Sequence, residues 1–190
     1  MPTPDAIADA AYRIYIAEGL PGLSMRNVAD RIGVTATALY RHFDGKDALV
    51  EAVSERGFHL FAARLLRKPV PRDPRRRVLQ ILDRYREFAF RQPELFHLMF
   101  ATRRPRVRRF PADFSAHRSS VFDELRHAVE RGQAEGEIRR GGSLEIALDL
   151  WAHAHGLVSL YQVGRFGEAP RSFTGLYRRS LDRFLRGLRP

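Results

Sequence analysis

Apolar residues recur with the period of an α-helix along almost the whole chain, and this pattern restricts the fold more than any other feature. The cleanest example places six apolar residues on one helical face: Val78, Ile81, Leu82, Tyr85, Phe88 and Ala89. No segment shows the strict alternation of a half-buried strand, and no internal repeat is visible. The sequence therefore predicts an all-α protein of about nine helices.

Glycine, proline and hydroxyl residues mark where these helices should begin and end. Gly33 is expected to end the second helix in a left-handed turn, and Thr35 is expected to cap the third. Three further features are expected: a cap at Asp44, a cap at Ser143, and one long helix from Phe114 to Gly132. These boundaries rest on local residue preferences alone.

Composition excludes several functional classes. The chain has no cysteine, which excludes disulfides, cysteine-ligated zinc, iron–sulfur clusters and a thiol nucleophile. It has no run of 18 apolar residues, so no membrane span is expected. Its first residues lack the basic-then-apolar layout of a signal peptide. With 44% hydrophobic and 29% charged residues, we expect a soluble, cytoplasmic globular protein.

The formal net charge of +11 suggests a polyanionic partner, such as nucleic acid, a membrane surface or an acidic ligand. Residues 1–67 hold eight basic and eight acidic residues, so the whole excess lies after residue 67. Much of it falls in residues 67–77 and 103–109, which we interpret as solvated loops. A secondary phosphate contact by the first of these loops is the alternative.

The segment from Leu23 to Phe43 has the pattern of a helix-turn-helix: a helix, a glycine, an apolar residue and a hydroxyl cap precede another helix. Ala29 is small where the two helices would cross, Gly33 permits the left-handed turn, and Val34 fills the corner. In this motif the helix after the turn lies in the major groove of DNA, while its partner crosses the backbone.

The stretch from Gly22 to Val53 resembles the DNA-binding domain of TetR-type transcriptional regulators. The resemblance is carried by Val28-Ala29, Gly33-Val34-Thr35, Leu39-Tyr40, His42-Phe43, Gly45-Lys46-Asp47 and Leu49. The chain departs from the family pattern at Thr37-Ala38, where many members have Gly-Thr, and at Gly45, where Ser or Asn is common. The resemblance implies a three-helix DNA-binding domain over residues 1–45 and a helical ligand-binding and dimerisation domain over residues 46–190. A helix over residues 46–67 would connect the two.

Nine residues are expected to form the DNA-contacting surface: Met25, Arg26, Thr35, Ala36, Thr37, Tyr40, Arg41, His42 and Lys46. Tyr40 and His42 carry ring donors suited to phosphate oxygens, with core packing as the alternative for Tyr40. Lys46, in the first turn of a helix, would add its charge to the free N–H groups there. Arg26 is placed where family members often reach a base edge, and arginine binds guanine bidentately; a solvated side chain is the alternative.

Residues 85–100 and 151–160 resemble a C-terminal domain of this family named for its Trp-His-Gly motif, with Trp151, His155 and Gly156 at the motif positions. Eleven residues are candidates for lining a pocket for a small, mainly apolar ligand: Phe58, Phe61, Leu65, Tyr85, Phe88, Phe96, Met99, Phe100, Phe122, Trp151 and His155. His155 or Tyr85 would be its polar anchor, and ordinary core packing is the alternative. His153 and His155 point about 200° apart on a helix, so they cannot chelate one ion; no metal or cofactor is expected.

The leading hypothesis is a homodimeric repressor that pairs through its last two helices and leaves a palindromic double-stranded DNA operator when the ligand binds. The alternatives are an activator, a ligand-independent regulator and a charge-driven, nonspecific nucleic-acid-binding protein. An enzyme is not expected, because the sequence has no phosphate loop, dinucleotide-binding glycine motif or nucleophile elbow. A specific regulator would prefer one palindromic site, whereas a nonspecific binder would bind any duplex with a steep salt dependence.

Overall fold

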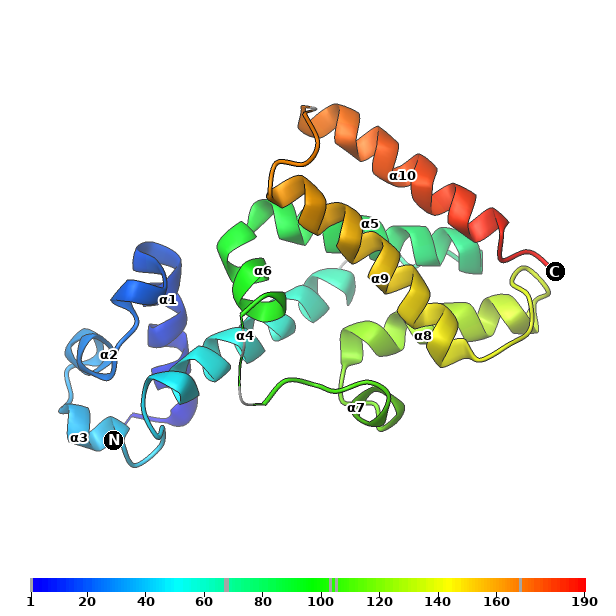
Figure 1. Cartoon of the computed structure of the whole chain (residues 1–190). Helices are drawn as coiled ribbons and strands as arrows, with labels where there is room; N and C mark the ends of the chain where they lie inside the picture. The colour runs from blue at the N-terminus through cyan, green and yellow to red at the C-terminus, as the bar shows by residue number, and fades with distance from the viewer. Residues whose placement is uncertain (1, 67–68, 103, 105, 168) are drawn as a thin grey trace. The chain divides into compact units, whose positions relative to one another are not determined.

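The structure is a computed structural model of the 190-residue chain and describes residues 2–66, 69–102, 104, 106–167 and 169–190. The described residues form ten α-helices and no strand (Figure 1), which confirms the all-α prediction. The expected long helix is instead two helices, α7 (Ala112–Ser115) and α8 (Ser120–Ala134), which corrects the count of nine. His117 lies between them with a φ of 55°, outside the helical region. Within the described residues, no helix is long and apolar enough to cross a membrane.

The first three helices each begin at a hydroxyl side chain: α1 (Pro4–Gly22), α2 (Met25–Ile32) and α3 (Ala36–Leu39). The hydroxyls of Thr3, Ser24 and Thr35 each accept the backbone N–H three residues further on, at 3.2, 3.1 and 3.3 Å. A cap of this kind stabilises a helix by about 1 kcal/mol, so the short α2 and α3 start at fixed residues. The cap predicted at Thr35 is confirmed.

The turn between α2 and α3 depends on a glycine. Gly33 has φ 70° and ψ 38°, a left-handed conformation that costs other residues strain. The N–H of the next residue, Val34, donates to the carbonyl of Ala29 at 3.1 Å and closes the turn. Behind it Val28, Ala29 and Leu39 are almost completely buried. These features confirm the predicted helix-turn-helix.

The fourth helix, α4 (Lys46–Leu66), ends before Pro69, as the sequence predicts. Its start differs from the expectation. Gly45, with φ 112°, directly precedes the helix, and its carbonyl accepts the N–H of Leu49 at 3.3 Å. Gly45 therefore occupies the capping position, and the cap expected at Asp44 is wrong by one residue.

The chain divides into two compact units, which are described separately below. The first unit is Met1–Phe61 with Gln92–Val107, and the second is Ala62–Arg91 with Arg108–Pro190. The first therefore holds α1 to α3, most of α4, and α6 (Pro93–Phe100). The functional boundary expected near residue 45 stays a prediction, because compactness alone does not define which residues bind DNA or ligand.

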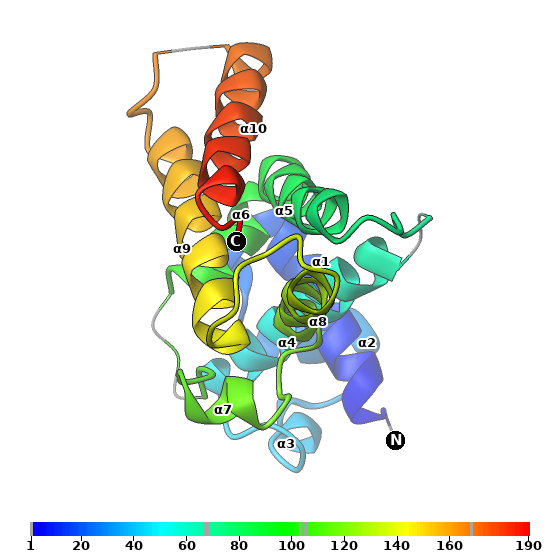
Figure 2. The same ribbon diagram turned by 90° about the vertical axis from the view of Figure 1, so that its right-hand side faces the viewer.

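The second unit contains the longer helices: the end of α4, α5 (Pro74–Arg91), α7, α8, α9 (Ser143–Gln162) and α10 (Pro170–Arg186). Asp73 Oδ1 accepts the N–H of Arg76 at 3.0 Å and so caps α5, which begins at Pro74. In Figures 1 and 2, α9 and α10 run antiparallel beside each other. Tyr177 of α10 is buried and donates its hydroxyl to the carbonyl of Leu82 in α5 at 2.7 Å. This bond fixes α10 on α5.

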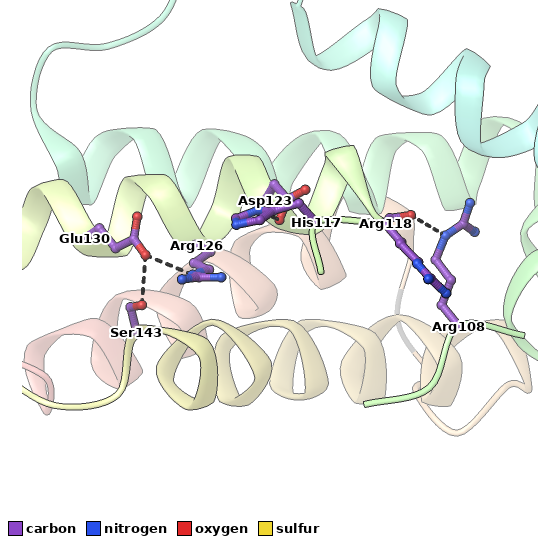
Figure 3. A network of polar contacts seen from close by, with 7 residues as sticks. All are labelled: Arg108, His117, Arg118, Asp123, Arg126, Glu130 and Ser143. Carbon is purple, nitrogen blue, oxygen red and sulfur yellow. Dashed lines mark hydrogen bonds and ion pairs between the residues drawn. The ribbon is translucent and has the colours of Figure 1, made fainter. Parts of the chain in front are cut away.

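Side-chain bonds join α8 to the start of α9 (Figure 3). The cap expected at Ser143 is wrong, because Ser143 is the first residue of the helix. Its hydroxyl instead donates to Glu130 Oε1 at 3.0 Å, and Arg126 Nε donates to the same oxygen at 2.8 Å. At the other end of α8, His117 Nδ1 lies 3.0 Å from Asp123 Oδ1. Arg108 and Arg118 join the segments before and after α7, because Arg108 Nε donates to the Arg118 carbonyl at 2.6 Å.

Candidate nucleic-acid interface

Eight of the nine side chains expected to contact DNA are accessible to solvent, and we call them the α2–α3 surface: Arg26, Thr35, Ala36, Thr37, Tyr40, Arg41, His42 and Lys46. Tyr40 is 56% exposed, which argues against the alternative that it is a core residue. Met25 differs from the expectation, because it is only 7% exposed and belongs to the core of the first unit. Its side chain is therefore not available to a partner on the surface.

Lys46 has a partner inside the first unit. Its Nζ donates to the carbonyl of Leu20 at 2.9 Å. Leu20 lies in the last turn of α1, where the backbone carbonyls have no partner within the helix. The Lys46 ammonium is itself exposed, so it can exchange this carbonyl for a phosphate oxygen at little cost. In the free protein, Lys46 thus links the end of α1 to the start of α4.

Two other cations, both on α2, lie close to carboxylates. Arg26 Nε is 4.0 Å from Asp30 Oδ2 on α2, and both side chains are largely exposed. Arg31 on the same helix pairs with Glu18 of α1 at 3.3 Å. Exposed pairs of this kind contribute little to stability. They do lower the local positive potential, in keeping with the formally neutral charge of residues 1–67.

The arrangement is suited to reading a rigid, grooved polyanion. The capped α3 presents hydroxyl, phenol, guanidinium and imidazole donors on an exposed surface. Behind that surface Leu39, Leu49 and Val53 are completely buried, so the backbone that carries the donors rests on a packed core. A helix with exposed side chains fits the major groove of B-DNA, where donors meet base edges and phosphates.

The eleven candidates for a ligand pocket divide between the two units. Five belong to the first: Phe58, Phe61, Phe96, Met99 and Phe100. Phe100 brings three of them together, because its ring centroid is 5.5 Å from that of Phe58 and 4.8 Å from that of Phe96. Phe61 and Met99 are buried in the same unit. These contacts show a connected aromatic cluster between α4 and α6.

The other six candidates lie in the second unit: Leu65, Tyr85, Phe88, Phe122, Trp151 and His155. Tyr85 and His155 are the two residues expected as alternative polar anchors. They are hydrogen-bonded to each other, with 2.7 Å between Tyr85 Oη and His155 Nδ1. The Trp151 ring lies 6.0 Å from His155 and 6.1 Å from Phe122. Leu65 and Phe88 are buried in the same unit. The second unit thus places a polar pair among aromatic rings.

Two further residues belong to this cluster but are not among the eleven candidates predicted from the sequence. Ser159 Oγ lies 3.2 Å from His155 Nε2, and its position four residues after His155 on one helix could have indicated this contact. Phe114 packs 4.8 Å from Phe122, but it lies in a four-residue helix whose position no local pattern reveals. His153 contacts Ser180 at 3.0 Å instead of His155. Among the described residues no group of three potential metal ligands occurs.

Burial keeps the Tyr85–His155 pair uncharged at neutral pH. It raises the pKa of Tyr85 well above 10.0, although a hydrogen bond from Trp151 acts in the opposite direction. Burial also lowers the pKa of His155 below 6.5. Tyr85 Oη and Ser159 Oγ lie 2.7 and 3.2 Å from the two ring nitrogens of His155, so both nitrogens of the neutral imidazole have a hydrogen-bond partner. The polar groups of this cluster are therefore neutral, and their role as a ligand anchor stays a prediction.

The lowered pKa of His155 has a consequence for stability. In the unfolded chain a histidine has a pKa of about 6.5. Below that pH the unfolded state therefore binds more protons than the folded state. We expect the free energy of unfolding to fall as the pH drops from 7 to 5, and to fall less in His155→Gln. Urea unfolding at both pH values measures this. His59→Gln, an exposed histidine on α4, should leave the fall unchanged; an equal fall in all three proteins would contradict the assignment.

Comparison with known proteins agrees with this architecture in both halves of the chain. Residues 7–53 match the family model described as bacterial regulatory proteins, tetR family. Residues 78–184, more than half of the chain, match the model described as tetracyclin repressor-like, C-terminal domain. The HTH-type transcriptional repressor DrrR1 of Streptomyces coeruleorubidus is 44% identical over 54 residues, which is 28% of this chain and 20% of that protein. The chain thus covers about a fifth of the length of this curated relative.

Solved structures extend the likeness to the whole fold. A protein of unknown function from Rhodococcus sp. RHA1 superposes with a TM-score of 0.79 and 28% identity, covering 98% of this chain and 95% of that one. TetR-Q116A from Acinetobacter baumannii AYE, in complex with minocycline, superposes with a TM-score of 0.67 and 18% identity. That match covers 98% of this chain and 96% of the other.

Proposed function

This chain belongs to the TetR family of bacterial regulatory proteins, and from that premise we propose that it is a DNA-binding transcriptional repressor that a small, mainly apolar ligand releases. The observation that carries the proposal is the α2–α3 surface, a capped recognition helix with exposed donors on a buried core. The regulator would act in the cytoplasm, where its operator lies. It would perform no catalysis.

On DNA, α3 enters the major groove. Thr35, Thr37 and Arg41 face base edges, while Tyr40 and His42 donate to phosphates on either side. Lys46 gives up the Leu20 carbonyl and binds a phosphate, so one ammonium serves the free and the bound state in turn. Arg26 leaves Asp30 to reach a base or phosphate. Because residues 1–67 carry no net charge, affinity depends on these placed donors more than on bulk attraction.

Two copies are needed to read a palindrome, and α9 with α10 supplies the face for pairing. We call this face the α9–α10 surface: Ala152, Gly156 and Leu160 of α9, Val163 directly after α9, and Gly175 and Leu176 of α10. Leu160 is 46% and Val163 69% exposed, which is unusual for large apolar residues. A Cβ atom on Gly156 would meet no described atom within 4 Å. Ala152, Gly156 and Leu160 are small or apolar, lie four residues apart on one side of α9 and are all at least partly exposed, which suits a helix from a second copy.

The ligand would bind in the second unit beside Tyr85, His155 and Trp151. These groups are neutral and lie among aromatic rings, so they favour an uncharged, mainly apolar molecule with one hydrogen-bonding group. The minocycline complex of the Acinetobacter relative supports binding of a small molecule by this fold. Ligand binding would then alter the spacing of the two reading heads and lower operator affinity.

A DNase footprint on the DNA upstream of the chain's own coding sequence tests the proposal. We expect a protected palindrome with half-site centres about 34 Å apart. Addition of compounds from a lipophilic library should abolish protection for at least one compound. A footprint that no compound changes would favour the ligand-independent alternative, and the absence of any protected site would remove the proposal.

A further inference from the structure

Arg104 lies in the basic stretch 103–109, interpreted from sequence as a solvated loop, yet its guanidinium is buried. The side chain is 4% exposed and pairs with Glu51 of α4, with 3.0 Å between Nη1 and Oε1. Its Nη2 donates to the carbonyl of Met99 at 2.9 Å, in the last turn of α6. One guanidinium therefore bridges α4 and the end of α6 within the first unit. The planar guanidinium presents separate nitrogens to the two acceptors, an arrangement that a lysine ammonium does not reproduce.

Stability alone does not account for this ion pair. Among the described residues, Arg104 Nε, Glu51 Oε2 and the nearby Ser54 Oγ are buried without a hydrogen-bond partner. Moving two charges out of water is costly, and an ion pair recovers this cost only when its remaining polar atoms are satisfied. In some proteins such buried groups are retained because they specify one geometry.

The geometry in question is the attachment of residues 92–107 to α1 and α4. At the start of α6, Tyr15 of α1 donates its hydroxyl to the carbonyl of Glu94 at 2.8 Å. In the middle, α6 approaches so closely that a Cβ on Gly57 would lie 2.6 Å from Met99 Sδ. The third attachment is Arg104 to Glu51, five residues after the first residue of α4. The segment is thus fixed at both ends and in the middle.

Both ends of this segment continue into the second unit, at residues 91 and 108. If the segment is fastened to α4, the reading helices connect to the second unit through three crossings of the chain. Without the Arg104 pair, the attachments at Glu94 and Met99 remain, but the part of the segment that leads to residue 108 is no longer fastened to α4. A dimer that reads two half-sites needs a defined distance between its two heads, whereas one head on one half-site does not.

We propose that Arg104 is a positioning residue for operator binding: by holding Glu51 it fastens residues 92–107 to the DNA-reading helices and thereby fixes the spacing of the two heads. The assignment rests on the proposed function, since it concerns affinity for an operator. The side chains of Arg104 and Glu51 are only 4% and 16% exposed. The pair therefore acts through α4 and not by contacting DNA. In the sequence, Arg104 and Arg106 are equivalent members of one basic stretch. In the structure, Arg104 is buried and Arg106 is exposed.

The test compares Arg104→Met and Glu51→Gln with Arg106→Met, which removes the same charge from the exposed side of the same stretch. The probes are a duplex that the wild-type protein selects from a random pool and a duplex holding only one of its half-sites. Arg104→Met and Glu51→Gln should each lower affinity for the full duplex about tenfold and for the half-site less than threefold. Arg106→Met should change both by less than twofold.

Two results would overturn the assignment. If Arg104→Met equals Arg106→Met, the buried pair has no effect on binding. If full-site and half-site affinities fall by the same factor, the pair is merely structural. Glu51→Gln keeps the size and hydrogen-bonding shape of the side chain, so it gives the same comparison if Arg104→Met does not fold. A wild-type protein that selects no duplex would instead refute the proposed function.

Discussion

Replacing Gly156 by tryptophan is expected to convert the protein from a dimer into a folded monomer. A Cβ at this position meets no described atom, so the single chain has room for a large side chain. Within a helix, tryptophan also has a better intrinsic propensity than glycine. In a dimer paired through the α9–α10 surface, the indole would clash with the second copy. Light scattering on a size-exclusion column gives the mass directly.

The loss of pairing should reduce operator affinity about a thousandfold, because linked heads gain roughly 10² to 10⁴ over single heads. Gly167→Trp is the matched control: a Cβ at Gly167 also meets no described atom, but the residue lies after α9 and outside the α9–α10 surface. It should remain dimeric. A Gly156→Trp protein that stays dimeric would show that the chain pairs through another face.

The double replacement Tyr40→Ala with His42→Ala is expected to lower operator affinity at least a hundredfold with little change in melting temperature. Each side chain would donate to a phosphate, and a hydrogen bond to a charged group contributes about 1.5–3 kcal/mol. A two-fold dimer loses each contact twice. Both residues are exposed in the free protein, so their removal costs the fold little.

Fluorescence anisotropy with a labelled operator measures the affinity, and circular dichroism measures the melting temperature. His59→Ala, exposed on α4 outside the α2–α3 surface, is the control and should bind as the wild type does. If the double variant binds within threefold of the wild type, Tyr40 and His42 do not contact DNA. If the melting temperature of the double variant is much lower than that of the wild type, the two side chains stabilise the fold. The loss of affinity would then come from the loss of folded protein.

Local chemistry made part of the fold predictable from sequence. The Thr35 cap and the left-handed Gly33 each depend on atoms within about four residues, and the structure confirms both. The caps expected at Asp44 and Ser143 are wrong by one residue, since a glycine beside each takes the capping position. Neighbouring residues with similar preferences cannot be ranked without the tertiary contacts around them.

The parts of the site that sequence could not reveal depend on residues distant along the chain. The place of Lys46 in the first helical turn predicts a phosphate contact, whereas its bond to the carbonyl of Leu20, 26 residues away, depends on how α1 packs near the start of α4. Arg104 was grouped with a solvated basic loop, although Glu51 lies 53 residues away in the chain and holds it in the interior. Apolar periodicity identified the aromatic pocket candidates but gave no information about which of them share a compact unit.

The most direct test of the central claim is the ratio of affinities for a selected palindromic duplex and for the same bases in scrambled order, at physiological salt. A sequence-specific regulator should prefer the palindrome by about a thousandfold or more. The preference should persist as salt is raised, because the phosphate contacts that salt weakens are common to both duplexes, whereas the base contacts are not. Equal affinity for the two duplexes, falling steeply and in parallel with salt, would contradict the account and identify a charge-driven, nonspecific binder.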